Sequence, residues 1–275
     1  MTASSTHDHT TTNGTRTIVH CVDSYSIMLN MPDNHFDLAV VDPPYGINET
    51  AKNAKRNSKG MKRDHFKDYG TENWDASAPG KEFFEQLFRI SKHQIIFGAN
   101  HFIENLPDGK RNASCWIVWD KVRSGDFADC ELAWTSFPKA VRQLTFTWQA
   151  GHNPLIPKRM HLTQKPVELY EWIYRKYAAP GWTILDTHLG SGSSRIAAAK
   201  CGYDFTGYEI SASIYEKHIK FFEAEMAQLG MYEESFAVNE LSPEKLSNKV
   251  HGQGLYHYIK KPEKDYKDSL LIIGE

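Results

Sequence analysis

Short apolar runs alternate with amphipathic segments along most of the chain, beginning at residue 17. The runs are rich in β-branched and aromatic side chains, which favour strands. They predict strands at 17–21, 36–41, 94–98, 115–119, 131–134 and 144–148. Apolar residues recur at helical spacing over 79–92, which predicts a helix there, and a second helix is predicted over 165–177.

The clearest unit lies later in the chain. A strand over 182–186 leads into a glycine turn at 189–193, a helix over 194–200 and a second strand over 204–209. Strand, glycine turn, helix and strand in this order are typical of a doubly wound α/β fold. We therefore expect a Rossmann-like, mostly parallel sheet.

The glycine turn has the features of a nucleoside-binding site. Its glycines let backbone N–H groups approach a ligand closely, and Glu209 ends the next strand, where a carboxylate can accept hydrogen bonds from ribose hydroxyls. Arg195 stands where the dinucleotide fingerprint requires a third glycine, and no P-loop lysine follows Gly192. These departures favour S-adenosylmethionine, which has no pyrophosphate. A plain tight connection between strand and helix is the alternative.

A second motif, Asp42-Pro43-Pro44-Tyr45, directly follows the strand over 36–41, and ligands bind at the carboxyl edge of such sheets. Methylation of an exocyclic amine requires the nitrogen lone pair to be aimed at the methyl donor. The Asp42 carboxylate and the Pro43 carbonyl can accept the two N–H groups of that amine. Tyr45 offers a face on which an extruded base can stack, worth roughly 1–3 kcal/mol. The alternative is a proline turn in which Asp42 caps a helix.

Composition narrows the class of protein. The 275 residues are 40% hydrophobic, which excludes a disordered or fibrous chain, and no apolar run approaches the ~20 residues of a membrane span. The amino terminus lacks the regions of a signal peptide, so we expect a cytoplasmic protein in which residues 1–15 form a disordered tail. Four cysteines without CxxC spacing argue against a disulfide framework, and we expect no metal site.

The net charge of −2 conceals a segregation of charges along the chain. Segment 46–70 carries seven basic and three acidic residues, and segment 136–165 carries five basic residues and no acid. Seven glutamates against three lysines make segment 216–247 acidic. The first basic segment follows the proline turn, and the second leads into the Thr-Gln-Lys-Pro motif at 163–166. In these places both segments can contact nucleic acid.

Three motifs stand in a fixed order: Asp-Pro-Pro-Tyr at 42–45, Thr-Gln-Lys-Pro at 163–166 and Asp-Thr-His-Leu-Gly-Ser-Gly-Ser at 186–193. This order resembles the β-class DNA amino-methyltransferases, in which the catalytic turn precedes the cofactor loop. The resemblance covers about residues 17–225 and implies a circularly permuted, seven-stranded methyltransferase fold that uses S-adenosylmethionine and acts on double-stranded DNA. An Asp at the start of the proline turn favours adenine N6 in this family, with cytosine N4 as the alternative.

The resemblance also assigns roles to individual residues. Asp42, Pro43, Pro44 and Tyr45 form the catalytic turn. The expected cofactor contacts are Asp23 at the adenine edge, Glu209 at the ribose, Asp186 at the amino group, Gly190 and Gly192 along the methionine part, and Thr163 and Lys165 at the carboxylate. Asp23 has an alternative role as the cap of the helix that follows it. Family members commonly carry Pro-Phe where this chain has Thr187-His188, so His188 is expected either to pack near the cofactor or only to replace an aromatic wall.

The catalytic domain is expected to span 16–230, with 231–275 as a peripheral extension. The expected DNA contacts are Lys55, Arg56, Lys62 and Arg63 in the basic loop 46–70, and Lys139, Arg142, Lys158 and Arg159 in a short target-recognition region at about 136–162. The sequence leaves open whether the protein forms a homodimer. Two further alternatives are a methyltransferase acting on RNA or on a protein amide, and a catalytically silent DNA-binding relative.

Overall fold

The computed structural model describes residues 5–47, 77–122, 128–146 and 164–240, with side chains up to residue 230. Its strands are β1 (Ser5–Thr10), β2 (Arg16–Cys21), β3 (Phe36–Val41), β4 (Ser91–Phe97), β5 (Trp116–Asp120), β6 (Cys130–Thr135), β7 (Arg142–Thr145), β8 (Thr183–Asp186) and β9 (Asp204–Glu209). Its helices are α1 (Ser24–Met28), α3 (Lys81–Ile90), α4 (Val167–Tyr177), α5 (Ser193–Cys201) and α6 (Ala212–Glu240), with short 3-10 turns at Ala99–His101 and Ile103–Asn105.

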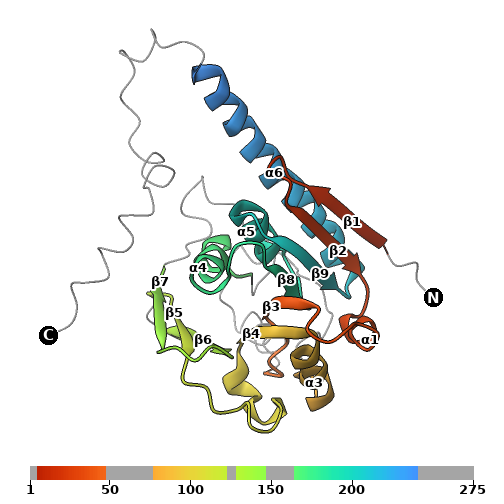
Figure 1. The fold of residues 1–275 in the computed structure, drawn as a ribbon, viewed down its shortest axis with the longest axis vertical. Coiled ribbons are helices and arrows are strands. Elements are labelled where there is room, and N and C mark those ends of the chain that lie inside the picture. The colour runs from red at the N-terminus through yellow and green to blue at the C-terminus, as the bar shows by residue number, and fades with distance from the viewer. Residues whose placement is uncertain (1–4, 48–76, 123–127, 147–163, 241–275) are drawn as a thin grey trace, which may run out of the picture. The chain divides into compact units, whose positions relative to one another are not determined.

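The strands form one sheet in the order β1-β2-β9-β8-β3-β4-β6-β5-β7 (Figure 1). Strands β2, β9, β8, β3 and β4 are parallel neighbours, whereas β6 runs antiparallel to both β4 and β5. The α/β class and the mostly parallel sheet are therefore confirmed. The described sheet has nine strands and not seven, because β1 and β7 add one strand at each edge.

Helices cover both faces of the sheet (Figure 1), and the alternation of side chains along β3 shows how. Leu38 and Val40 lie in the apolar cluster that includes α4, while Ala39 and Val41 lie in the cluster that includes α1 and α3. Successive strand residues point to opposite faces, so a strand buried on both sides reads as a continuous apolar run. This is the run seen at 36–41.

The expectation of a disordered tail over residues 1–15 is wrong for residues 5–10. These residues form β1, which pairs antiparallel with β2 along its whole length. The strand has no aliphatic side chain, so its sequence gives no apolar signal. It is held by the β2 ladder and by the rings of His7 and His9, which pack edge-on against Phe222 of α6.

The sheet has a topological switch point between β8 and β3. From β8 the chain passes through α5 to β9 on one side, and from β3 through α3 to β4 on the other. Crossovers that leave in opposite directions open a crevice at the carboxyl ends of the two strands, where ligands bind in such folds. Asp42 follows β3 and Asp186 ends β8, so both carboxylates lie at this crevice.

The chain divides into two compact units, residues 1–227 and 228–275. Of the second unit the structure describes only the end of α6. Among the helices that are described, none is both long and apolar enough to cross a membrane.

Candidate active site

The proline turn is held by a ring of hydrogen bonds among three side chains. Asp42 accepts a hydrogen bond at Oδ1 from the Tyr45 hydroxyl (2.7 Å) and one at Oδ2 from Lys165 Nζ (2.5 Å). Lys165 Nζ also donates to the Tyr45 hydroxyl oxygen at 3.1 Å. Because each member contacts the other two, the plane of the Asp42 carboxylate is fixed before any ligand binds.

The ring of Tyr45 is fixed by two neighbours that follow β4. Gly98 has a φ of +66°, and a Cβ at this position would overlap Cε1 of Tyr45. The ring of Tyr45 can therefore occupy this place only because residue 98 is glycine. His101 stacks on Tyr45 with ring centroids 5.3 Å apart and planes inclined by 16°.

Glu131, the second residue of β6, completes a line of alternating charges at the proline turn. Its Oε2 lies 3.3 Å from Lys165 Nζ, and its Oε1 lies 2.7 Å from Lys121 Nζ. The side chain of Lys165 is only 4% exposed, so its charge depends on these partners. Sequence reasoning missed Glu131; the only signal was an acidic residue at the start of an otherwise apolar strand.

The charges of this group support one another. Burial would lower the pKa of Lys165, but the negative charges of Asp42 and Glu131 outweigh burial and raise it. Burial raises the pKa of Asp42, and the Lys165 charge opposes that rise. Burial acts in the same sense on Glu131, but the two lysines lower its pKa overall. Lys165 is therefore cationic at neutral pH.

The glycine turn follows β8 directly. Gly190 and Gly192 have φ values of +53° and +79°, and a Cβ on Gly192 would overlap Cδ2 of His218. Both positions favour glycine because their backbone is left-handed. Glu209, at the end of β9, anchors this turn by accepting the Gly190 N–H at Oε2 (2.9 Å).

Asp186 is the buried acid of the turn. It accepts hydrogen bonds from the His188 N–H (3.0 Å) and from the Ser194 hydroxyl (2.5 Å). Burial raises the pKa of Asp186 to about 7, and the charges of Asp42 and Glu209 add to the effect of burial. A crevice that gathers three carboxylates favours a cationic ligand, because a bound positive charge relieves their repulsion.

Two other predicted positions have clear structural roles. Asp23 caps α1 by accepting hydrogen bonds from the N–H groups of Tyr25 and Ser26. His188 packs beside Phe83 with ring centroids 5.3 Å apart, and burial lowers its pKa to about 4. His188 is therefore neutral at physiological pH and forms part of an aromatic wall.

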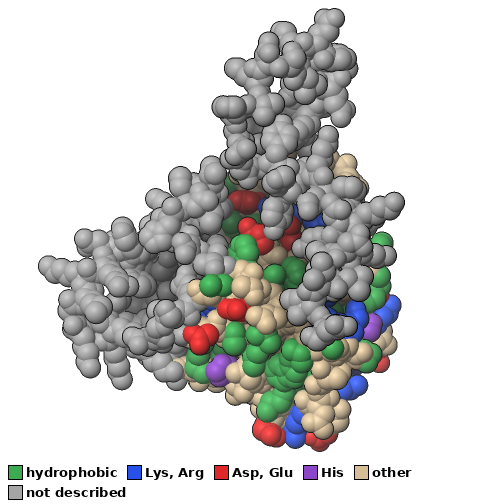
Figure 2. Space-filling view, turned by 90° about the vertical axis from the view of Figure 1, so that its left-hand side faces the viewer, with side chains coloured by type: hydrophobic (Ala, Val, Ile, Leu, Met, Phe, Trp, Pro, Cys, Tyr) green, Lys and Arg blue, Asp and Glu red, His purple; other side chains and the backbone are tan. Residues whose placement is uncertain are grey.

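The structure brings Lys165 to the proline turn, a placement that sequence reasoning did not foresee. Of the basic residues expected at DNA, Lys139 lies over the rings of Phe137 and Tyr177, and Arg142 is exposed at the start of β7. Thr163 and the remaining expected DNA contacts lie outside the described residues: Lys55, Arg56, Lys62, Arg63, Lys158 and Arg159. On the face shown in Figure 2, acidic and basic side chains of the described residues are dispersed among apolar ones.

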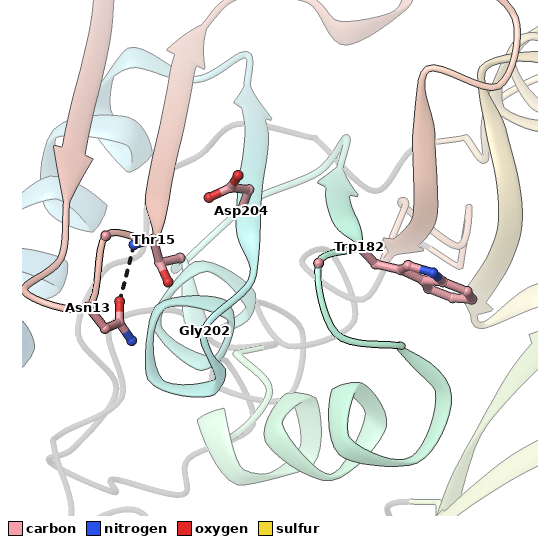
Figure 3. A pocket seen from close by; sticks show the side chains of 7 residues that line it. Asn13, Thr15, Trp182, Gly202 and Asp204 are labelled. Atoms are coloured by element: carbon pink, nitrogen blue, oxygen red, sulfur yellow. Dashed lines mark hydrogen bonds between the residues drawn. The ribbon is translucent and has the colours of Figure 1, made fainter.

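A hollow of about 200 Å³ lies at the opposite edge of the sheet (Figure 3). It is lined by residues at the amino ends of β2, β8 and β9, including Thr15, Trp182 and Asp204. The switch-point crevice is at the carboxyl ends, so this hollow is a separate feature. Within the residues that the structure describes, no group of three His, Cys, Asp or Glu side chains is arranged to hold a metal ion.

Comparison with known proteins finds a family that resembles part of this chain. Residues 106–220 match the N6_N4_Mtase family, described as DNA methylase. This segment is similar to DNA methylases of the N6/N4 type. The match includes the motifs at 163–166 and 186–193 and begins after the proline turn. The resemblance to DNA amino-methyltransferases is thus confirmed at the level of the family.

The chain also resembles individual proteins. A Type II methyltransferase, M1.MboII of Moraxella bovis, is 40% identical over 55 residues, which is 20% of this chain and 21% of that protein. The chain therefore matches only about a fifth of the length of this relative.

Solved structures that align with this chain include TTHA0409 of Thermus thermophilus (16% identity, TM-score 0.48, 76% of this chain and 94% of that one). They also include M1.HpyAVI in its SAM complex (19% identity, TM-score 0.46, 74% of this chain and 97% of that one). A third is PvuII DNA methyltransferase, a cytosine-N4-specific enzyme (11% identity, TM-score 0.49, 79% of this chain and 94% of that one).

Proposed function

We propose that this protein transfers the methyl group of S-adenosylmethionine to the N6 amine of adenine in double-stranded DNA. The observation that carries the proposal is the pairing of Asp42 in a proline turn with Asp186 beside a glycine turn at one switch point. The two carboxylates are close enough for the charge of Asp42 to raise the pKa of Asp186. The DNA methylase match over 106–220 supports the same chemistry.

The residues at the glycine turn fit this cofactor. S-adenosylmethionine carries a sulfonium and an ammonium, and the Asp186 carboxylate suits the ammonium. Glu209 is the proposed acceptor of the ribose hydroxyls. Gly190 has no atom nearer than 3.9 Å to where a Cβ would stand, which leaves room for a close approach of a ligand, whereas Gly192 lets the turn pack against His218. When bound, the cofactor supplies an electrophilic methyl group and leaves as a neutral thioether. Asp23 and Thr163 stay proposed contacts.

Asp42 and Pro43 orient the amine that is methylated. A carboxylate has about four lone-pair sites, and Tyr45 and Lys165 use two of those on Asp42. The remaining sites can accept an N–H from the amine, while the Pro43 carbonyl accepts the other. This arrangement aims the nitrogen lone pair along the line of attack. After the N–C bond forms, Asp42 accepts the surplus proton.

Tyr45 provides the stacking surface for the extruded base. Gly98 and His101 hold its ring in place, so little side-chain conformational entropy is lost when a base stacks on it. Stacking contributes roughly 1–3 kcal/mol per base, which helps offset the few kcal/mol needed for extrusion. The basic residues Lys139 and Arg142, with those outside the described residues, would contact the phosphates.

Expression in cells that lack DNA methylation tests the proposal. Modification-sensitive sequencing of their DNA is expected to show N6-methyladenine in a defined context with the wild-type protein. The Asp42→Ala variant is expected to leave the DNA unmodified and to bind the cofactor normally in calorimetry. N4-methylcytosine in place of N6-methyladenine would reassign the base, and unmodified DNA with the wild type would overturn the function.

A further inference from the structure

We propose that Glu131 is a positioning residue for methyl transfer, holding the Lys165 ammonium against Asp42 and Tyr45. The inference rests on the proposed function. Glu131 lies in none of the three sequence motifs, and its carboxylate contacts Lys165, which in turn contacts Asp42.

The direction of β6 explains how Glu131 arrives at the crevice. Parallel strands deliver their last residues to the carboxyl edge, as β3 does with Asp42. Strand β6 is antiparallel, with Ala133 paired to Phe97 at the end of β4, so its first residues lie at that same edge. Glu131 and Asp42 therefore face Lys165 from two different strands.

The Lys165 ammonium has as many acceptors as it has donors. Its three N–H groups meet Asp42 Oδ2 at 2.5 Å, the Tyr45 hydroxyl at 3.1 Å and Glu131 Oε2 at 3.3 Å. Two acceptors already fix the rotation of the ammonium about its Cε–Nζ bond, and the third gives the last N–H a partner in a place that is largely shielded from water. Glu131 is thus the contact that completes the partners of the Lys165 ammonium.

Glu131 is itself held by a second cation. Its Oε1 lies 2.7 Å from Lys121 Nζ, and that ammonium also lies over the ring of Trp119. The order Lys121, Glu131, Lys165, Asp42 alternates in sign and sums to zero. Loss of the Glu131 charge would leave an excess positive charge beside Asp42, in a place where charges are poorly solvated.

This arrangement has a consequence that a purely structural ion pair does not have. The groups facing Asp42 are Tyr45 and its stacked neighbour His101, Lys165, Glu131, Tyr170 and Asp186. Among them the negative charge of Glu131 raises the pKa of Asp42. Removal of that charge must therefore lower the pKa of Asp42, whereas a change in packing alone need not.

The experiment compares Glu131→Gln and Glu131→Asp with the wild type, using steady-state methylation of duplex DNA across pH 5–9. Glu131→Gln keeps the shape, and kcat is expected to fall about 10- to 100-fold, the range for a lost hydrogen bond between charged groups. In a plot of kcat against pH, the fall in kcat on the acid side reports the pKa of an essential acid in the enzyme–substrate complex. If that acid is Asp42, this low-pH limb should move to lower pH in Glu131→Gln. Glu131→Asp keeps the charge, so it should lower kcat and leave the limb in place.

Glu171→Gln is the matched control. Glu171 is also largely buried and faces two cations, Arg175 and Lys200, on α4 and α5, away from the proline turn. This variant should keep both kcat and the pH limb of the wild type. Cofactor affinity measured by calorimetry should be the same in all four proteins.

A Glu131→Gln enzyme with wild-type kcat and an unmoved limb would overturn the inference while leaving the proposed function intact. A wild type that methylates no DNA would overturn the function instead. In that case a ¹³C NMR titration of the Asp42 carboxyl carbon reads the charge effect directly. A lower pKa in Glu131→Gln supports the coupling, and an equal pKa refutes it. If Glu131→Gln does not fold, kcat is measured for Glu131→Asp and Lys121→Met instead. Both variants should lower kcat, and a wild-type kcat in both would overturn the inference.

Discussion

The buried carboxyl of Asp186 makes a quantitative prediction about stability and cofactor binding. Its pKa is raised from 3.8 to about 7, first by burial and then by the charges of Asp42 and Glu209. A raised pKa in the folded state means that the folded protein binds this proton more tightly than the unfolded chain. Stability from this group is therefore full below pH 3.8 and is lost as pH rises through about 7.

The size of the effect follows from the pKa difference. One pKa unit corresponds to about 1.4 kcal/mol, so ionisation of Asp186 costs the empty protein about 4 kcal/mol by pH 9. Asp186→Asn removes the charge and keeps one hydrogen-bond acceptor. About 3 kcal/mol of the cost to the wild type arises between pH 5 and pH 9. The melting temperature of the variant, relative to the wild type, should therefore rise by roughly 5–10 °C over this range.

Differential scanning calorimetry of the cofactor-free proteins across this range is the assay. Asp37→Asn is the control, since Lys92 and Thr183 lower the pKa of Asp37 against the effect of burial. Its melting temperature relative to the wild type should be lower and should not vary between pH 5 and pH 9. An Asp186→Asn difference that is equally flat would refute the reasoning about Asp186.

Cofactor binding should respond in the opposite direction. A cationic ligand favours the ionised carboxylate, so the affinity of the wild type for S-adenosylmethionine should increase as pH rises through 7. Calorimetry in buffers of different ionisation enthalpy should record proton release on binding near pH 7. Asp186→Asn should bind weakly at every pH and release no such proton. Proton release that persists in the variant would assign the effect to another group.

The remaining predictions concern the base and the DNA. Gly98→Ala should displace the Tyr45 ring, because the new Cβ would overlap it, and should reduce kcat for DNA without changing cofactor affinity. Tyr45→Phe keeps the stacking face and should retain more activity than Tyr45→Ala, for which a loss of roughly 1–3 kcal/mol is expected; equal losses would argue against stacking. Replacing Lys139 and Arg142 together with Ala should weaken DNA binding and reduce its salt dependence by about 0.9 per lost phosphate contact; an unchanged slope would remove both residues from the interface.

Local patterns in the sequence were sufficient for much of the fold. The predicted strands at 36–41 and 204–209 match β3 and β9 at both ends. Both could be predicted because a strand buried on both faces and a tight glycine turn each leave a pattern in consecutive residues. The rule for carboxyl ends of parallel strands likewise places the proline turn at the crevice, and the family resemblance places Asp186 at the cofactor.

Features that depend on distant parts of the chain could not be found in this way. Strand β1 is polar throughout and is held by β2 and by Phe222, which is more than two hundred residues further along the chain. The contact between Lys165 and Asp42 spans 123 residues of sequence. Glu131 reaches the site because β6 runs against its neighbours, and the apolar pattern of a strand does not reveal its direction.

The proposed reaction is methyl transfer to an exocyclic amine of DNA, directed by Asp42. Its most direct test incubates the purified protein with S-adenosylmethionine tritiated in the methyl group and unmodified duplex DNA, followed by separation of the nucleosides. Label is expected in N6-methyldeoxyadenosine with the wild type, and no label with Asp42→Ala. Unlabelled DNA with the wild type, or equal label with Asp42→Ala, would contradict the proposed reaction.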